Sequence, residues 1–289
     1  MLLCVMGPTA SGKTGLAIQL ALSLDGEVVS CDSMQVYRGM DIGTSKPAEA
    51  ERHGVPHHML DVADPSEPYS AAQYAGQASA CIESIRARGR LPIVCGGTGL
   101  YFDALLYGLH GIGGCGGHMR QELAGRAGRE GLAPLYAELA RVDPESASYI
   151  SANDERRIIR ALEVYHSTGV PLSRHHEISK SKPPRYGDAL LLGIRFRDRA
   201  ALYERIDRRV DGMMAEGLLD EVRALLERQP PPSHTAMQAI GYKELAAALR
   251  GEITVEDAAA QIKQSTRRYA KRQITWFRKY PDIRWIEAG

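Results

Sequence analysis

The chain has 289 residues, enough for one large domain or two smaller ones, and a net charge of only +1. Its 44% hydrophobic and 25% charged residues are typical of a soluble globular protein, and no global field favours nucleic acid or an anionic membrane. The five cysteines form no Cys-x-x-Cys pair, and no apolar run is long enough for a signal peptide or a membrane span. We expect a cytoplasmic, monomeric protein with no membrane partner, in which any nucleic-acid site is local.

Strands and helices alternate over the first hundred residues. Leu2 to Met6 and Glu27 to Cys31 are short apolar runs typical of buried parallel strands, and Leu91 to Cys95 is a third. Leucines at helical spacing predict a helix over Lys13 to Leu24, and the amphipathic pattern of Ser70 to Arg88 predicts another. A shorter helix is expected to begin near Pro47, because proline suits a first helical turn. This alternation predicts an α/β fold in which helices cover both faces of a parallel sheet.

The pattern changes after Tyr107. The glycine-dense stretch GLHGIGGCGGH predicts a flexible crossing, and residues 119–165 are helical in pattern without strand signals. Ala189 to Phe196 restores a buried strand, and two helical runs broken by QPPPSHT lead to a last short strand at Ile283 to Ile286. We therefore predict a catalytic core over residues 1–109 and 187–289, with an inserted all-helical domain over 110–186.

The stretch GPTASGKT, Gly7 to Thr14, matches the phosphate-loop pattern G-x-x-x-x-G-K-[ST] between a predicted strand and a predicted helix. In such loops the backbone N–H groups and the helix N-terminus surround phosphate oxygens, the lysine adds a positive charge and the hydroxyl residue binds Mg²⁺. Mg²⁺ is thus the expected cofactor, with Thr14 as its protein ligand. The predicted phosphate-binding residues are Gly7, Thr9, Ala10, Ser11, Gly12, Lys13 and Thr14.

The usual machinery for triphosphate hydrolysis is incomplete. A hydrolysing enzyme of this type needs a metal-holding aspartate at the end of a second apolar strand. The strand at Leu91 to Cys95 runs into Gly96-Gly97-Thr98 with no carboxylate, and Asp32 is the nearest substitute. Phosphate binding without phosphoryl transfer is chemically reasonable if the phosphate is a leaving group.

The C-terminal helical run carries a local positive charge. From Ile262 to Tyr280 there are seven basic residues and no acidic one, and several recur at helical spacing. A charge run of this kind is commonly a solvated helix face. Its one-sidedness and the nearby amide of Gln273, which could read a base edge, favour RNA instead.

Several sequence blocks together resemble one family. GPTASGKT, DSMQVYRGMDIGTSKP, VPHHMLDVADPSEPYSAAQY, GGTGLY, NDERRIIRALEVY, AIGYKEL and TRRYAKRQITWFRK are similar, in order and spacing, to the blocks of tRNA dimethylallyltransferases. The resemblance extends from the first residues to about Tyr280. It implies a P-loop NTPase-like core and transfer of a dimethylallyl group from dimethylallyl diphosphate to N6 of the adenosine 3′-adjacent to the anticodon. The phosphate loop would then hold a leaving diphosphate.

The resemblance also implies roles for particular residues. Asp32 would accept the proton of the attacking amine, and Thr98 and Arg209 would act near the donor diphosphate. The implied tRNA contacts are Ser33, Gln35, Tyr37, Arg38 and Asp41 near the flipped base, and Arg267, Arg268, Lys271, Arg272 and Gln273 on the C-terminal helix. This helix and the inserted domain would hold the anticodon stem-loop.

Alternative interpretations remain open from the residues themselves. Asp32 could cap the turn after its strand, Thr98 could be a helix N-cap, and Arg209 could be a solvated or surface-paired cation. For the whole chain, the alternatives are a small-molecule P-loop kinase that uses ATP, a prenyltransferase acting on free adenine nucleotide, and an RNA-binding protein with a degenerate site.

Overall fold

Two units make up the chain in the computed structural model, which describes residues 1–108, 117–181 and 183–288. The core unit comprises Met1–Leu105 and Tyr186–Gly289, and the helical unit comprises Leu106–Arg185. Most of the predicted glycine-dense crossing, residues 109–116, lies outside the described residues.

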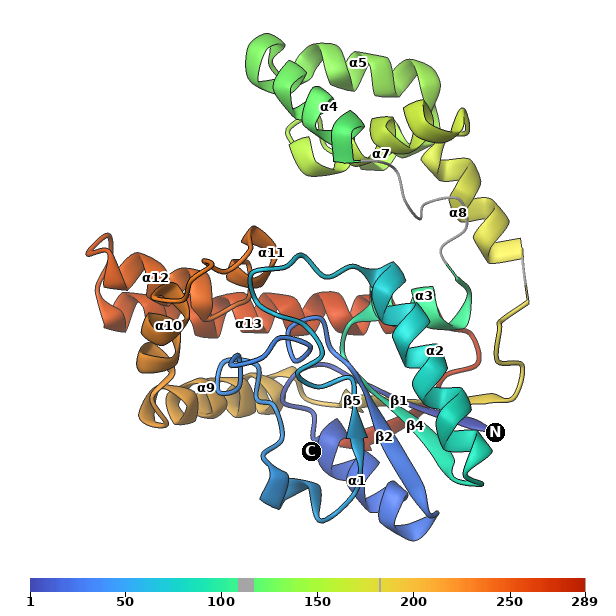
Figure 1. Ribbon diagram of the computed structural model, residues 1–289, viewed down its shortest axis with the longest axis vertical. Coiled ribbons are helices and arrows are strands. Elements are labelled where there is room, and N and C mark those ends of the chain that lie inside the picture. Colours follow the sequence, from blue (N-terminus) through green and yellow to red (C-terminus); the bar gives the residue numbers. More distant parts are fainter. Residues whose placement is uncertain (109–116, 182, 289) are drawn as a thin grey trace. The chain divides into compact units, whose positions relative to one another are not determined.

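Six parallel strands form the sheet of the core unit. They are β1 (Leu2–Met6), β2 (Gly26–Cys31), β3 (His57–His58), β4 (Leu91–Gly96), β5 (Ala189–Phe196) and β6 (Arg284–Ala288). Their order is β3-β2-β4-β1-β5-β6, and every pairing is parallel. The predicted α/β fold with a parallel sheet is confirmed, and Figure 1 shows the sheet with its flanking helices. The consequence for function is that β2, β4 and β1 end side by side.

The strands are buried on both faces, which explains their continuous apolar runs. Leu3 and Val5 of β1 pack in one cluster with Ala17 and Ile18 of helix α1 (Lys13–Ser23). Successive strand residues point to opposite faces, so Leu2, also fully buried, lies on the other side of the sheet.

Helix α2 (Ala71–Ala87) contacts β2 and β4. It begins where predicted, because Ser70 and Gln73 form a reciprocal capping box: the Ser70 hydroxyl accepts the Gln73 N–H and the Gln73 side chain accepts the Ser70 N–H. The helix expected near Pro47 is instead a single 3₁₀ turn, η1 (Glu49–Arg52). His53 follows it in the left-handed conformation, with φ 49°, and this ends the turn.

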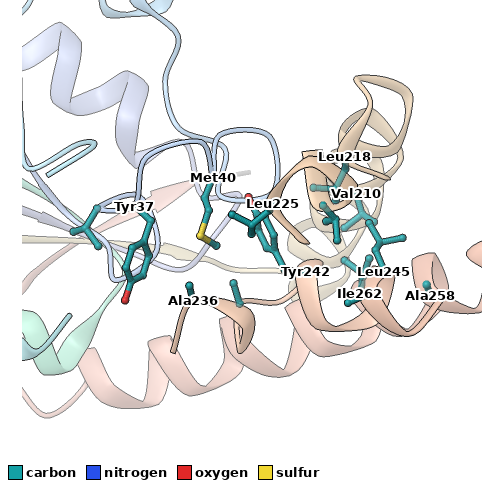
Figure 2. Close-up of a cluster of buried hydrophobic side chains, with 14 of the residues drawn as sticks. Tyr37, Met40, Val210, Leu218, Leu225, Ala236, Tyr242, Leu245, Ala258 and Ile262 are labelled. Carbon is teal, nitrogen blue, oxygen red and sulfur yellow. The ribbon is translucent and has the colours of Figure 1, made fainter. Parts of the chain in front are cut away.

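The remaining helices of the core unit are α3 (Gly99–Leu106), α9 (Arg199–Ala215), α10 (Leu218–Leu226), α11 (His234–Met237), α12 (Tyr242–Leu249) and α13 (Val255–Phe277). Helices α9 to α13 contribute to a second hydrophobic cluster together with the loop that follows β2 (Figure 2). Tyr37 and Met40 of that loop are fully buried against residues such as Leu225 and Tyr242. The loop after β2 is therefore packed into the protein.

The helical unit contains α4 (Gly117–Glu130), α5 (Leu132–Val142), α6 (Pro144–Tyr149), α7 (Glu155–Thr168) and α8 (Leu172–Ser181), with no strand among its described residues. Its own core gathers Leu123, Leu135, Leu139 and Leu162, among others. The buried carboxylate of Glu163 accepts hydrogen bonds from two arginines of the same unit. The predicted all-helical character of this segment is confirmed. None of the described helices in either unit combines the length and apolarity needed to span a membrane.

Candidate functional site

Three polar segments meet where β1, β2 and β4 end. The phosphate loop follows β1, Asp32 follows β2 and Thr98 follows β4, and these strands are neighbours in the sheet. A cavity of about 1050 Å³ opens beside them in the core unit. Ligands of open parallel sheets bind at the carboxyl ends of the strands, as expected here. The predicted site residues that line the cavity are Thr9, Ala10, Ser11, Gly12, Lys13, Thr14, Asp32, Ser33, Gln35, Arg209, Arg272 and Gln273.

The phosphate loop presents hydrogen-bond donors that the protein leaves unmatched. In the described part of the chain, the backbone N–H groups of Gly12, Lys13 and Thr14 donate no hydrogen bond. The hydroxyl of Ser11 is buried and also has no partner there. Burial lowers the pKa of the Lys13 amine, while the nearby Asp32 acts to raise it. Unmatched donors around a lysine at a helix N-terminus fit an anion.

Two side chains from distant segments fix this loop. The Gln273 side chain of α13 accepts the Thr9 N–H at 2.9 Å and donates to the Gly97 carbonyl at 2.9 Å. From α9, the Nε of Arg205 donates to the Ala10 carbonyl at 2.9 Å. Ala10 has φ 61°, a left-handed conformation that a non-glycine residue rarely adopts, so these contacts maintain a demanding backbone shape.

Gln273 contacts the phosphate loop and Gly97, whereas the sequence predicted that its amide contacts RNA. The oxygen and the nitrogen of its amide are each bonded inside the protein and the side chain is buried, which favours a structural role over reading a base. A Cβ at position 97 would lie 2.1 Å from the Gln273 amide nitrogen, which explains the glycine in GGTGLY.

The two carboxylate oxygens of Asp32 differ in their hydrogen bonding. Its Oδ1 accepts the N–H of Met34 at 2.8 Å and, more weakly, that of Gln35 at 3.4 Å, so the carboxylate does cap the turn after β2. Among the described residues no hydrogen bond involves Oδ2. A carboxylate fixed through one oxygen, on a cavity wall, can accept a proton through the other.

Thr98 lies behind the cavity wall. Its Oγ1 accepts the N–H of Ser33 at 3.1 Å, which joins the end of β4 to the turn that follows β2. Thr98 is not one of the residues that line the cavity. Tyr269 of α13 does line it, and burial raises the pKa of the Tyr269 hydroxyl. A direct contact of Thr98 with a donor diphosphate stays a prediction.

Arg209 faces the cavity from α9. Its Nε donates to the hydroxyl of Ser45 at 2.6 Å. Burial lowers the pKa of its guanidinium, and the negative charges of Asp32 and Glu216 oppose that shift. The partner of Arg209 is thus a loop hydroxyl and not a surface carboxylate, which favours the cavity position over a solvated surface arginine.

The segment that follows Asp32 is mostly committed to internal contacts. Gln35 donates to the carbonyls of Thr44 and Ser45, each at 3.1 Å, and accepts from the hydroxyl of Ser30. Tyr37 is fully buried and its hydroxyl accepts the Tyr69 N–H. The prediction that Tyr37 contacts a base is wrong for this structure, because its side chain is fully buried and belongs to the second hydrophobic cluster.

Arg38 and Asp41 are exposed but lie outside the cavity lining. Arg38 donates to the Asp61 carbonyl and Asp41 forms an ion pair with Lys46. Their predicted contacts with RNA stay predictions.

The positive charge of α13 is partly neutralised. Arg267 forms two hydrogen bonds to the carboxylate of Asp207 in α9, at 2.8 and 2.7 Å, and Lys263 pairs with Asp211 at 2.6 Å. By contrast, Arg268, Lys271 and Arg272 are exposed, and no ion pair involves them in the described ranges. The sequence has no acidic residue between Ile262 and Tyr280, and the partner of Arg267 comes from a helix sixty positions earlier. The cations that remain available are the outward-facing ones.

Sequence reasoning missed three residues of this region: Arg205, Glu221 and Tyr269. Arg205 lies four positions before Arg209, on the same face of α9, and this spacing could have indicated it. Tyr269 and Glu221 carry no comparable signal, because their importance depends on tertiary contacts.

The residues present are compatible with Mg²⁺. No group of three histidine, cysteine, aspartate or glutamate side chains is arranged for a metal within residues 1–108, 117–181 and 183–288. A phosphate-bound Mg²⁺ does not need one, because it takes one or two protein ligands beside phosphate oxygens and waters. The Thr14 hydroxyl on the cavity wall meets that requirement.

Fold and site define a class: a P-loop α/β protein whose loop is prepared for a phosphate group and whose nearby carboxylate lies in the same cavity. Comparisons with known proteins narrow this class. A family model described as IPP transferase matches residues 35–280. The chain is 52% identical over 286 residues to tRNA dimethylallyltransferase 1 of Pelobacter propionicus, covering 99% of this chain and 92% of that protein. It is 48% identical to the tRNA dimethylallyltransferase of Caldanaerobacter subterraneus, covering 98% and 90%.

Solved structures agree. The tRNA isopentenylpyrophosphate transferase of Bacillus halodurans matches with a TM-score of 0.71 and 42% identity, covering 99% of this chain and 89% of that one. A eukaryotic dimethylallyltransferase acting on tRNA matches with a TM-score of 0.82 and 32% identity, covering 99% and 73%. The chain belongs to the IPP transferase family, whose members include the tRNA dimethylallyltransferases.

Proposed function

We propose that this enzyme transfers the dimethylallyl group from dimethylallyl diphosphate to N6 of the adenosine 3′-adjacent to the anticodon in tRNA. The observation that carries the proposal is the shared cavity: a loop of unmatched donors that fits a diphosphate and a carboxylate with one free oxygen line the same space. A cavity of about 1050 Å³ leaves room for both an isoprenoid donor and an extruded base.

The reaction is an alkyl transfer. The N6 amine forms a bond to C1 of the dimethylallyl group, the C1–O bond breaks, and the electron pair of that bond leaves with pyrophosphate. Lys13, the loop N–H groups and Arg209 stabilise the negative charge that develops on the leaving group. Asp32 accepts the amine proton through Oδ2 and orients the weakly nucleophilic amine. Thr14 would hold Mg²⁺, which supplies further positive charge to the diphosphate when bound.

The RNA is held by sequence-independent charge as well as by the base. The exposed cations Arg268, Lys271 and Arg272 on α13 contact phosphates of the anticodon stem-loop, and the helical unit contributes a second surface. Ser33 lines the cavity, which supports its assignment as a contact of the extruded adenine or its neighbours. We expect the enzyme to act as a monomer, which light scattering of the free protein and its tRNA complex would check.

A single assay separates this function from the alternatives. The protein is incubated with labelled dimethylallyl diphosphate and unmodified tRNA, and in parallel with AMP as acceptor and with labelled ATP as donor. Label in tRNA supports the proposal. Label in AMP alone would indicate a prenyltransferase of free nucleotides, and phosphoryl transfer from ATP without prenylation would indicate a kinase.

A further inference from the structure

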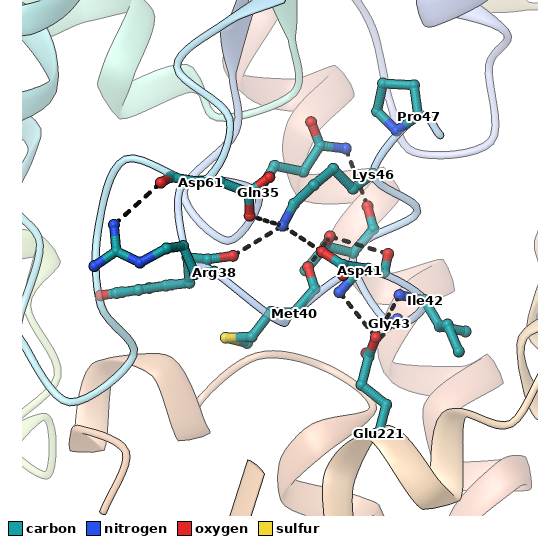
Figure 3. Close-up of polar contacts among 12 residues, drawn as sticks. Gln35, Arg38, Met40, Asp41, Ile42, Gly43, Lys46, Pro47, Asp61 and Glu221 are labelled. Carbon is teal, nitrogen blue, oxygen red and sulfur yellow. Dashed lines mark hydrogen bonds and ion pairs between the residues drawn. The ribbon is translucent and has the colours of Figure 1, made fainter. Parts of the chain in front are cut away.

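Glu221 of α10 holds the loop of residues 41–45. Residues 43–45 of this loop line the same cavity as the phosphate loop. The Oε2 of Glu221 accepts the backbone N–H of Asp41 at 2.9 Å and that of Ile42 at 2.7 Å, and its Oε1 accepts the N–H of Gly43 at 3.0 Å (Figure 3). The hydroxyl of Tyr242 donates to the same Oε1. One carboxylate thus fixes three successive peptide groups, and charge-assisted hydrogen bonds of this kind are about twice as strong as neutral ones.

The surrounding residues leave this loop little freedom. A Cβ at position 43 would lie 2.5 Å from the Tyr242 ring, so only glycine fits between the ring and the loop backbone. At the far end of the loop, the ammonium of Lys46 donates to the Tyr37 carbonyl at 2.9 Å and to the carboxylate of Asp61 at 2.6 Å. Its side chain is only 4% exposed, so this anchor is internal.

Between these two anchors the loop presents Ser45 to Arg209. The Ser45 hydroxyl accepts from Arg209 Nε at 2.6 Å, and residues Gly43, Thr44 and Ser45 line the cavity. Ser45 itself has φ 47°, an uncommon conformation for a residue with a side chain, and such conformations persist where surrounding contacts enforce them. The position of Arg209 therefore depends on contacts made by Glu221.

The chemistry of this arrangement suits a diphosphate ligand. Ser45 is a neutral acceptor, so it orients the guanidinium through Nε without cancelling its charge. No hydrogen bond from Nη1 or Nη2 of Arg209 occurs among the described residues. These two nitrogens keep the paired donor geometry with which arginine binds phosphate oxygens. The carboxylate of Glu221 is bonded to peptide groups and a phenol, which keeps its charge engaged away from the anion site.

We propose that Glu221 is a positioning residue for the donor: it fixes the 41–45 loop so that Ser45 orients Arg209 toward the diphosphate. This inference rests on the proposed function, since it assumes that Arg209 meets the diphosphate of the prenyl donor. Glu221 itself acts only through the loop. The inference adds to the roles of Asp32 and the phosphate loop a second wall of the donor site, formed by residues 43–45 and Arg209 and held in position by Glu221 of α10.

The test compares Glu221→Gln with Glu227→Gln, a matched change at an exposed glutamate that follows the same helix and whose side chain makes no hydrogen bond or ion pair within the described residues. The amide of Glu221→Gln keeps one acceptor oxygen and places an NH₂ group against backbone donors. We expect the KM for dimethylallyl diphosphate to rise about tenfold with the KM for tRNA unchanged, and Glu227→Gln to match the unsubstituted protein. Ser45→Ala should raise the donor KM similarly, and the double variant should be no worse than the more affected single variant, because both changes act through Arg209.

Three results would overturn the inference: a Glu221→Gln protein with lower thermal stability but an unchanged donor KM, a rise in the tRNA KM instead, or fully additive effects with Ser45→Ala. If Glu221→Gln does not fold, Tyr242→Phe removes one of the four hydrogen bonds and should shift the donor KM in the same direction, by a smaller factor; no shift would refute the coupling.

The unsubstituted protein is assayed first, with calorimetric binding of dimethylallyl diphosphate. Absence of prenyl transfer there would count against the proposed function, and would be seen before any variant is compared.

Discussion

Replacing Gln273 with leucine tests whether this side chain prepares the phosphate loop or reads the RNA. The change keeps a side chain of similar size but removes the acceptor of the Thr9 N–H and the donor to the Gly97 carbonyl. Both partners lie at the junction of the phosphate loop, β4 and α13, where the glutamine is only 5% exposed. Water has little access to replace the lost contacts.

The expected cost follows from these two contacts. A net hydrogen bond contributes about 1 kcal/mol, and a buried partner left unsatisfied costs about 1–3 kcal/mol. At about 1–2 kcal/mol for each of the two partners, the loss is about 2–4 kcal/mol. If about half of this free energy is lost from the loop conformation that binds the donor, the affinity for dimethylallyl diphosphate drops about tenfold. The reason is that about 1.4 kcal/mol corresponds to a factor of ten.

The assay is steady-state prenyl transfer with each substrate varied in turn, together with thermal unfolding. Gln264→Leu is the matched control, because Gln264 is an exposed glutamine on the same helix with no described contact. Gln273→Leu should lower the Tm and raise the KM for the donor about tenfold, with little change in the KM for tRNA. A raised KM for tRNA with an unchanged donor KM would show that the amide reads a base after all, and would refute this reasoning.

Three further predictions concern the base, the RNA surface and stability. Asp32→Ala should reduce single-turnover prenyl transfer by at least a hundredfold, as expected for loss of a general base, with calorimetric donor affinity nearly unchanged; near-normal turnover would remove Asp32 from this role. Neutralising Arg268 and Lys271 should weaken tRNA binding and flatten its dependence on salt, whereas Arg267→Gln should do so less because Asp207 already pairs with it; equal slopes for all variants would contradict this. Burial raises the pKa of the Glu27 carboxyl, but hydrogen bonds from His58 and Arg88 outweigh burial and leave that pKa below its ordinary 4.5. The ionised carboxylate therefore stabilises the fold above pH 4.5. This contribution should be lost as the pH falls through the lower pKa of the folded state. Thermal unfolding from pH 6 to pH 3 should then show a smaller drop in Tm for Glu27→Gln than for the unsubstituted protein, and parallel curves would refute it.

Local patterns predicted the parts of the site that depend on neighbouring residues. The order of strand, phosphate loop and helix around Lys13 is written in consecutive residues. The meeting of the loop with Asp32 and Thr98 follows from parallel strands alone, because such strands end at one edge of the sheet. The inserted helical unit was visible as a long stretch without strand patterns.

The contacts that shape the site could not be predicted in the same way. Gln273 and Thr9 are 264 positions apart, and Arg205 and Ala10 are 195 apart, so no local pattern connects them. Tyr37 was assigned to RNA because it lies in a polar block beside Asp32. Its burial depends on helices α9 to α13, which pack over that block only in the folded chain. A turn beside a residue proposed to be catalytic can therefore belong to the hydrophobic core.

The positive stripe on α13 illustrates the same limit for charge. Its cations were counted along one helix, yet Asp207 and Asp211 of α9 neutralise two of them across the helix–helix contact. A count of charges within a segment therefore overstates the charge offered to RNA. Arg268, Lys271 and Arg272 carry the remaining prediction.

The most direct measurement of the central claim identifies the modified nucleoside and the leaving group together. Unmodified tRNA is incubated with the protein and dimethylallyl diphosphate, pyrophosphate is quantified, and the tRNA is digested for nucleoside mass analysis. A second tRNA, with guanosine in place of the adenosine 3′-adjacent to the anticodon, serves as control. The account predicts one N6-dimethylallyl adenosine per pyrophosphate released, and none in the control tRNA. Pyrophosphate release without prenylated adenosine, or prenylation of both tRNAs alike, would contradict it.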